Sequence, residues 1–96
     1  MNLIQHADSP RYIRLHELDN VAVVVNDQGV PAGTRFDNGL VTLDNVPQSH
    51  KVNLVDIAEG QPVIRYGQTI GYALQAIPRG SWVREDQLRI DRKSVV

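Results

Sequence analysis

Short apolar segments alternate with turn-forming residues along the whole chain. Val, Ile and Leu make up most of the apolar positions, and clusters of Gly, Pro, Asn or Asp interrupt them. Interruptions at intervals of roughly eight to twelve positions are typical of an all-β domain built from short strands and hairpins. The sequence REDQL at residues 84–88 is rich in helix formers, and we expect at most one helical turn there.

The apolar pattern places the strands and one hairpin. In residues 21–25 both alternate sets of side chains are apolar, which predicts a strand covered on both faces and therefore central in its sheet. Asn38 and Gly39 separate two alternating segments, which predicts a hairpin at residues 34–43. Further strands are expected at residues 12–16, 51–57, 62–67, 69–77 and 87–91.

A weak repeat with the pattern apolar-x-x-Gly-x-x-apolar runs through the chain. We expect each copy to be a turn that leads into a strand, with the glycine supplying a left-handed corner. One copy differs, because Ser49 stands at the glycine position. The copies are VPAGTRF at 30–36, VPQSHKV at 46–52, IAEGQPV at 57–63 and IPRGSWV at 77–83.

Length and composition limit the possible functions. A chain of 96 residues is expected to form a single domain, with residues 1–10 flexible and residues 91–96 a linker or tail toward further domains. Its 10 basic and 11 acidic residues form no basic stripe, which argues against nucleic-acid binding. The chain has no cysteine, and it shows no secretory or membrane segment. We therefore expect a cytoplasmic protein without disulfides and without a membrane partner.

Polar side chains gather where two apolar strands are expected to begin. His16, Asp19 and Asn20 precede one strand, and His50 and Lys51 stand at the start of another. If these strands were neighbours running the same way, the side chains would share one end of the sheet, offering imidazoles for acid–base chemistry and donors for a carboxylate. The alternative is structural, because Asp and Asn before a strand commonly form local turns, and a histidine there is commonly half-exposed without a task.

Other residues are candidates for lesser roles. Tyr66 and Tyr72 flank a short glycine-containing turn, and we interpret them as partly buried packing residues. Arg79 is expected to be exposed, where a guanidinium is either solvated or contacts a partner domain or an anionic ligand. The dispersed His and Asp residues do not offer the four ligands of a structural metal site, so no metal is expected on this domain alone.

Four motifs, taken in order over residues 12–84, resemble the N-terminal SAF domain of the altronate and galactarate dehydratase family. They are HELDNVAVVV, SHKVNLVDI, IRYGQTIGYA and IPRGSW. SAF domains adopt the β-clip fold, so the resemblance implies that fold here. The segments NVAVVVNDQGVPAGTRF and AIPRGSWV are more similar to the galactarate branch than to the altronate branch. One difference is Ser49, because the family usually has glycine before the His-Lys pair.

The resemblance implies part of a larger hydro-lyase that removes water from a sugar diacid, converting galactarate to a product of the 5-dehydro-4-deoxy-glucarate type. Its C-terminal partner domains would hold a divalent metal, typically iron, and most of the active site, in a homo-oligomeric holoenzyme. His16 and His50 would be catalytic, and Asp19, Asn20 and Lys51 would bind substrate. The isolated domain would be inactive.

Two other functions fit the same resemblance. The chain could be a non-catalytic SAF module that binds a ligand or docks a partner. It could also be the small subunit of a two-subunit lyase of the altronate or sulfolactate type.

Overall fold

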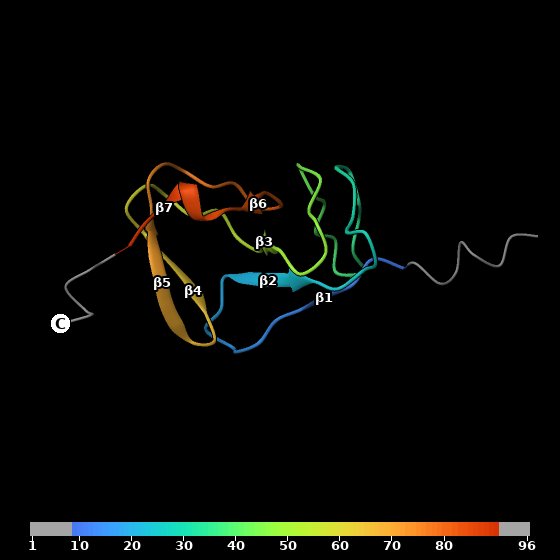
Figure 1. Cartoon of the computed structure of the whole chain (residues 1–96), viewed down its shortest axis with the longest axis horizontal. Coiled ribbons are helices and arrows are strands. Elements are labelled where there is room, and N and C mark those ends of the chain that lie inside the picture. The colour runs from blue at the N-terminus through green and yellow to red at the C-terminus, as the bar shows by residue number, and fades with distance from the viewer. Residues whose placement is uncertain (1–8, 91–96) are drawn as a thin grey trace, which may run out of the picture.

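The computed structural model describes residues 9–90, which form an all-β domain as the sequence predicts (Figure 1). The 3-10 helix η1 (Glu85–Gln87) lies within the stretch predicted to form one helical turn. The expectations for residues 1–10 and 91–96 fall outside the described residues, except at positions 9 and 10. No helix in the described part of the chain is long and apolar enough to cross a membrane. The strands are β1 (Tyr12–Ile13), β2 (Val21–Val24), β3 (Lys51–Asn53), β4 (Pro62–Arg65), β5 (Gln68–Ala73), β6 (Trp82–Val83) and β7 (Leu88–Arg89).

These strands form two antiparallel sheets (Figure 1). One sheet has the order β1-β2-β3-β6 and the other has the order β4-β5-β7. The prediction that residues 21–25 form a central strand is confirmed, since β2 lies between β1 and β3. Val21 packs with residues of the second sheet, whereas Ala22 and Val24 pack on the opposite face. The continuous apolar run thus reflects a strand that is buried on both faces.

The core consists of two apolar clusters, one on each face of the first sheet. The first cluster joins the two sheets and includes Val63, Ala73 and Leu88. The second cluster lies under the loops between β2 and β3, which project to the right in Figure 1, and includes Phe36 and Leu40. Loop residues are therefore part of the core, since Val30, Phe36, Leu40 and Val46 of the second cluster lie outside the strands.

The four copies of the sequence repeat form four similar turns. In each copy the fourth residue has a positive φ, and the N–H of the fifth residue donates to the carbonyl of the second. This is the geometry of a type II turn, whose third residue is normally glycine. The φ angles are 86° at Gly33, 72° at Ser49, 85° at Gly60 and 92° at Gly80. The predicted left-handed corner is confirmed, and Ser49 adopts it without being glycine.

The four turns are paired two by two. Val30, which begins the first copy, forms an antiparallel bridge with Val46, which begins the second. Ile57 and Ile77 form the same bridge between the third and fourth copies. In every copy the N–H of the left-handed residue donates to a backbone carbonyl elsewhere in the chain at 2.8 Å. The repeat therefore encodes turns that pair with one another, although they are far apart in the sequence.

Two hairpins differ in how closely they follow the pattern. The predicted hairpin at Asn38–Gly39 is present, but only the single pair Arg35–Val41 is bridged, so its arms are not continuous strands.

β4 and β5 are joined by the two-residue turn Tyr66–Gly67, in which both φ angles are positive. Tyr66 is 61% exposed, so the interpretation of this tyrosine as a packing residue is wrong. A side chain at the tip of a two-residue turn points away from the sheet and has little to pack against.

Candidate functional site

His16 and His50 lie at opposite ends of the first sheet, so the expectation that they share one end is wrong. β2 and β3 are neighbours, but they run antiparallel, with Val21 opposite Asn53 and Val23 opposite Lys51. His16 precedes the start of β2, whereas the carbonyl of His50 accepts the N–H of Val24 at the end of β2. At about 3.3 Å per residue, β2 alone separates the two ends by roughly 10 Å.

His16 lies against the turn that joins β4 and β5. Its Nδ1 accepts the N–H of Leu18 at 3.0 Å, so the proton of the neutral ring is on Nε2. The ring is so close to Gly67 that a Cβ at that position would come within 3.0 Å of its atoms. Gly67 is therefore required both by its positive φ of 70° and by the space that the imidazole occupies.

Asp19 fastens the same turn to the entrance of β2. The side chain is only 3% exposed, and its Oδ1 accepts the N–H of Gly67 at 2.8 Å. Burial acts to raise the pKa of Asp19, but the N–H groups of Gly67 and Tyr66 and the nearby His16 together hold that pKa below its ordinary value. The carboxylate is thus ionised and holds two parts of the chain together.

Asn20 connects the two sheets. Its Nδ2 donates to the carbonyl of Pro62 at 3.0 Å, and its Oδ1 accepts the N–H of Ile64 at 2.7 Å. Its backbone also bonds to Ile64 and to Leu54. Both ends of the amide are occupied by the β4 backbone, so the substrate-binding role expected for Asn20 competes with a structural one. The side-chain bonds to Pro62 and Ile64 reach across more than forty positions, and no sequence window around Asn20 could have revealed them.

His50 is paired with Trp82 on the face of the sheet that carries the loops. The indole Nε1 of Trp82 donates to Nδ1 of His50 at 3.2 Å, and the two rings meet edge to face with centroids 5.5 Å apart. As in His16, the engaged Nδ1 leaves the proton of the neutral ring on Nε2. Each imidazole therefore offers an exposed hydrogen-bond donor and no free acceptor nitrogen.

Lys51 points to the other face of the same sheet, because successive residues of a strand alternate. It lies beside Val23 and Val83 in the β3 register, on the side of the second sheet. Burial lowers the pKa of Lys51, and the charge of Arg65 lowers it further, while Glu85 acts in the opposite direction. His50 and Lys51 are adjacent in sequence, but their side chains do not form one cluster.

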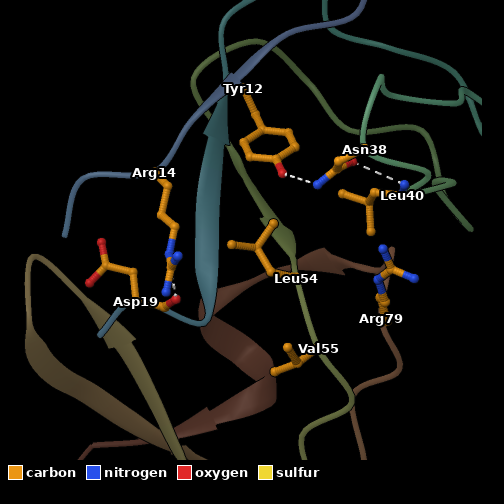
Figure 2. Close-up of a pocket in the computed structure, with 8 residues that line it drawn as sticks. All are labelled: Tyr12, Arg14, Asp19, Asn38, Leu40, Leu54, Val55 and Arg79. Atoms are coloured by element: carbon orange, nitrogen blue, oxygen red, sulfur yellow. Dashed lines mark hydrogen bonds between the residues drawn. The ribbon is translucent and has the colours of Figure 1, made fainter. Parts of the chain in front are cut away.

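A pocket of about 220 Å³ brings together residues that no sequence motif connects (Figure 2). Arg14 and Arg79 lie on opposite sides of Leu54, and Tyr12 and Asn38 border the upper edge in the view. Arg79 was expected to be exposed, with an anionic ligand as one possible contact, and it is exposed. The remaining members are Asp19, Leu40 and Val55.

Arg14 is held by the turn that precedes β2. Its Nε donates to the carbonyl of Asp19 at 3.1 Å, and its Nη2 donates to the carbonyl of Glu17. These acceptors are neutral, so they orient the guanidinium without cancelling its charge. The sequence offers little indication of this role for Arg14. Residues 12–16 are predicted to form a strand, and nothing in that pattern indicates that the arginine side chain folds back onto the next turn.

No metal-binding cluster is found in the described residues. Nowhere in residues 9–90 do three or more His, Asp or Glu side chains converge as they would to hold an ion. The buried Oδ2 of Asp19 has no hydrogen-bond partner, but no other metal-ligating side chain completes a site around it. The described side chains thus do not fit the iron that the sequence resemblance implies for the holoenzyme.

Comparison with known proteins identifies the domain. A family model described as the altronate/galactarate dehydratase SAF domain matches residues 10–91. Galactarate dehydratase (L-threo-forming) of Escherichia coli K12 is 51% identical over 84 residues, which cover 88% of this chain and 16% of that protein. Altronate dehydratase of the same organism is 45% identical over 80 residues, covering 82% of this chain and again 16% of that protein.

A further relative is matched over nearly its whole length. The (2R)-sulfolactate sulfo-lyase subunit alpha of Chromohalobacter salexigens is 29% identical over 87 residues, which cover 81% of this chain and 93% of that subunit. The chain thus spans about one sixth of the two dehydratases but nearly all of this subunit. The two antiparallel sheets and the single 3-10 turn agree with the β-clip fold expected of a SAF domain. The chain belongs to the family of altronate/galactarate dehydratase SAF domains.

Proposed function

We propose that this chain is the SAF part of a hydro-lyase that removes water from galactarate, with an active site completed by C-terminal domains or a partner subunit. The observation that carries this proposal is the 51% identity to galactarate dehydratase, against 45% to the altronate enzyme of the same organism. Both of these relatives are dehydratases, which supports a place for this chain within such an enzyme. The choice of galactarate rests on the difference between the two identities.

The reaction requires a base, an acid and stabilisation of negative charge. A proton is removed from the carbon next to a carboxylate, electrons move onto that carboxylate, and the neighbouring hydroxyl leaves as water after protonation. In the neutral form of each ring, His16 and His50 present Nε2–H, because Nδ1 accepts a hydrogen bond. We therefore assign to these imidazoles hydrogen-bond donation to substrate oxygens, and the base must be supplied by another part of the enzyme.

Of the two histidines, His16 is the stronger candidate. It begins the turn whose backbone carbonyls hold Arg14, which lines the pocket with Arg79, whereas His50 is at the other end of β2. Asp19 would then act by holding this turn in place and not by touching substrate. Asn20 would likewise hold the structure in place, by joining the two sheets. Lys51 would bind a substrate carboxylate that approaches from the side of the second sheet.

The divalent iron, the homo-oligomeric state and the cytoplasmic location are part of the proposal for the whole enzyme. Since the described residues do not fit a metal, we derive no step of the reaction through iron. We also propose that this chain alone does not turn over galactarate, because the base that removes the proton comes from another part of the enzyme.

The experiment is an assay of galactarate dehydration by the complete enzyme carrying paired substitutions. In His16→Asn a side-chain oxygen can still accept the N–H of Leu18, but the Nε2–H is lost. In His16→Gln an amide N–H lies near the position of Nε2. We expect kcat to fall on the order of 100-fold in His16→Asn and to recover in part in His16→Gln.

The same pair at His50 provides the comparison, with thermal unfolding as a check that each variant is folded. Full activity in all four variants would sink the catalytic role of the domain and leave docking as its function. Faster turnover of altronate than of galactarate would show that the substrate assignment is wrong.

A second candidate function, as a separate subunit of a lyase, is favoured by the match to nearly the whole sulfolactate sulfo-lyase subunit. That subunit consists almost entirely of a domain like this one, so a SAF domain also exists as a separate polypeptide. In the subunit version the chain would bind its catalytic partner without a covalent link. Co-purification of the complete partner with this chain after separate expression would support it, and failure to associate would contradict it.

A further inference from the structure

The pocket lined by Arg14 and Arg79 is rich in hydrogen-bond donors. The backbone N–H of Arg79 donates to Asp56 Oδ1, but its guanidinium makes no hydrogen bond or ion pair within residues 9–90, so the five side-chain N–H groups are available. Arg14 uses two of its N–H groups on backbone carbonyls and keeps its charge. Two cations thus face a cavity in a chain whose formal net charge is −1.

Tyr12 adds a further donor. The side-chain Nδ2 of Asn38 donates to the Tyr12 hydroxyl at 2.6 Å, and the Oδ1 of Asn38 accepts the N–H of Leu40 at 3.1 Å. Because the phenolic oxygen already accepts a bond, its own O–H is directed to another acceptor. No described neighbour takes that proton, which leaves it for an anion in the pocket.

The negative charge of Asp19 does not occupy the pocket. Figure 2 shows its carboxylate on the side of Arg14 that faces away from Leu54, and the Oδ1 accepts the N–H of Gly67. Between the two guanidiniums the wall is apolar, with Leu40, Leu54 and Val55. The pocket therefore has a cation at each side and an apolar middle.

The size of the pocket restricts the ligand to a small molecule. A volume of about 220 Å³ is below the range of roughly 300–1,000 Å³ that is usual for drug-sized ligands. Guanidinium groups match carboxylates in geometry as well as in charge, since two parallel N–H groups meet two oxygens. A cation at each side favours a ligand with an acid group at each end.

We propose that this pocket binds a short dicarboxylate, with one carboxylate on Arg14 and the other on Arg79 and the Tyr12 hydroxyl. The identity of the diacid as a sugar diacid rests on the proposed function. The pocket would then give the domain a preference for diacids over sugar acids that carry one carboxylate, because a monoacid leaves one arginine without a partner.

The test is titration of this 96-residue chain with galactarate, galactonate and sulfate at constant ionic strength, followed by NMR. Galactarate is expected to shift the signals of Tyr12, Arg14, Asn38 and Arg79, with at least about fivefold tighter binding than galactonate. Arg79→Gln should weaken galactarate binding at least about fivefold and remove most of the preference over galactonate. Arg89→Gln is the matched control, because Arg89 is an exposed arginine on β7 in the other sheet, and it should leave binding unchanged.

Three results would overturn the pocket assignment. They are the absence of shifts at these residues, equal shifts with sulfate, and equal loss of binding in the Arg89 control. Tyr12→Phe provides a second variant, which removes only the hydroxyl and should weaken galactarate more than galactonate. These results are separable from the proposed function. If the chain binds diacids but the complete enzyme does not depend on His16, the pocket assignment holds and the catalytic role of His16 fails. If dehydration depends on His16 but the chain binds no diacid, the catalytic role holds and the pocket assignment fails.

Discussion

Ser49 should be replaceable by glycine with a gain in stability. It occupies the left-handed corner of the turn Pro47–His50 with a φ of 72°, where the other three copies of the repeat have glycine. The bonds of this turn are made by the backbone, with the N–H of Ser49 donating to the Val24 carbonyl at 2.8 Å and that of His50 to the Pro47 carbonyl at 3.1 Å. Neither depends on the serine side chain, which makes no hydrogen bond in the described structure.

The magnitude follows from two opposing terms. A non-glycine residue in the left-handed region costs about 1–2 kcal/mol, and glycine loses about 0.5–1 kcal/mol more backbone entropy on folding. Ser49→Gly should therefore raise the free energy of unfolding by about 0.5–1 kcal/mol. In a domain of this size that corresponds to an increase in Tm of about 2–8 °C.

Two other turns provide matched controls in the same chain. At Gly60 a Cβ would meet no atom within 4 Å, so Gly60→Ser tests φ alone and should destabilise by an amount similar to the gain at Ser49. At Gly80 a Cβ would lie 2.2 Å from the carbonyl oxygen of Val41, so Gly80→Ala should cost considerably more. Urea and thermal unfolding measure all three. If Ser49→Gly were no more stable than the original chain while Gly60→Ser were neutral, the argument from φ would be refuted.

Two further predictions concern the turn before β2. Because the pKa of folded Asp19 lies below its ordinary value of 3.8, the ionised carboxylate stabilises the fold above that pH, and this contribution is lost as pH falls through the folded pKa. Asp19→Asn should thus show a shallower loss of stability below about pH 5 in acid unfolding, and an identical profile would contradict the assigned ionisation. Asn20→Ala should lower the free energy of unfolding by about 2–3 kcal/mol, since the carbonyl of Pro62 and the N–H of Ile64 lose their partners. A loss below about 0.5 kcal/mol in urea unfolding would show that the amide does not hold the sheets together.

The local pattern was sufficient for the fold class and for most strand positions. The alternation of apolar and polar residues, together with the turn residues, predicts short strands. The run of apolar residues on both faces of residues 21–25 predicts that β2 is central. The repeat predicts left-handed corners at its three glycines, and the structure adds the turn at Ser49, which adopts the same conformation without glycine. Backbone conformation at a tight turn is decided within a few residues, so sequence is informative there.

The candidate site was predicted less well, because its geometry depends on strand direction. Two histidines at equivalent positions of their segments suggest one site, yet antiparallel pairing of β2 and β3 places them at opposite ends. Asp19 and Asn20 resemble local turn formers, but their partners are Gly67, Pro62 and Ile64 in the other sheet. Partners at this distance along the chain cannot be inferred from the residues that surround each position.

By itself, then, the sequence determines an all-β SAF domain with left-handed turns at the glycines of its repeat, because hydrophobic period and turn chemistry act over short distances. Only the tertiary structure decides which polar groups meet. It directs the Asp19 carboxylate to Gly67, engages Nδ1 of both His16 and His50, and brings Tyr12 and Arg14 together with the distant Arg79 around one pocket. The reason is that side-chain encounters between distant segments follow from strand order and direction, which the two sheets fix only once the whole chain has folded.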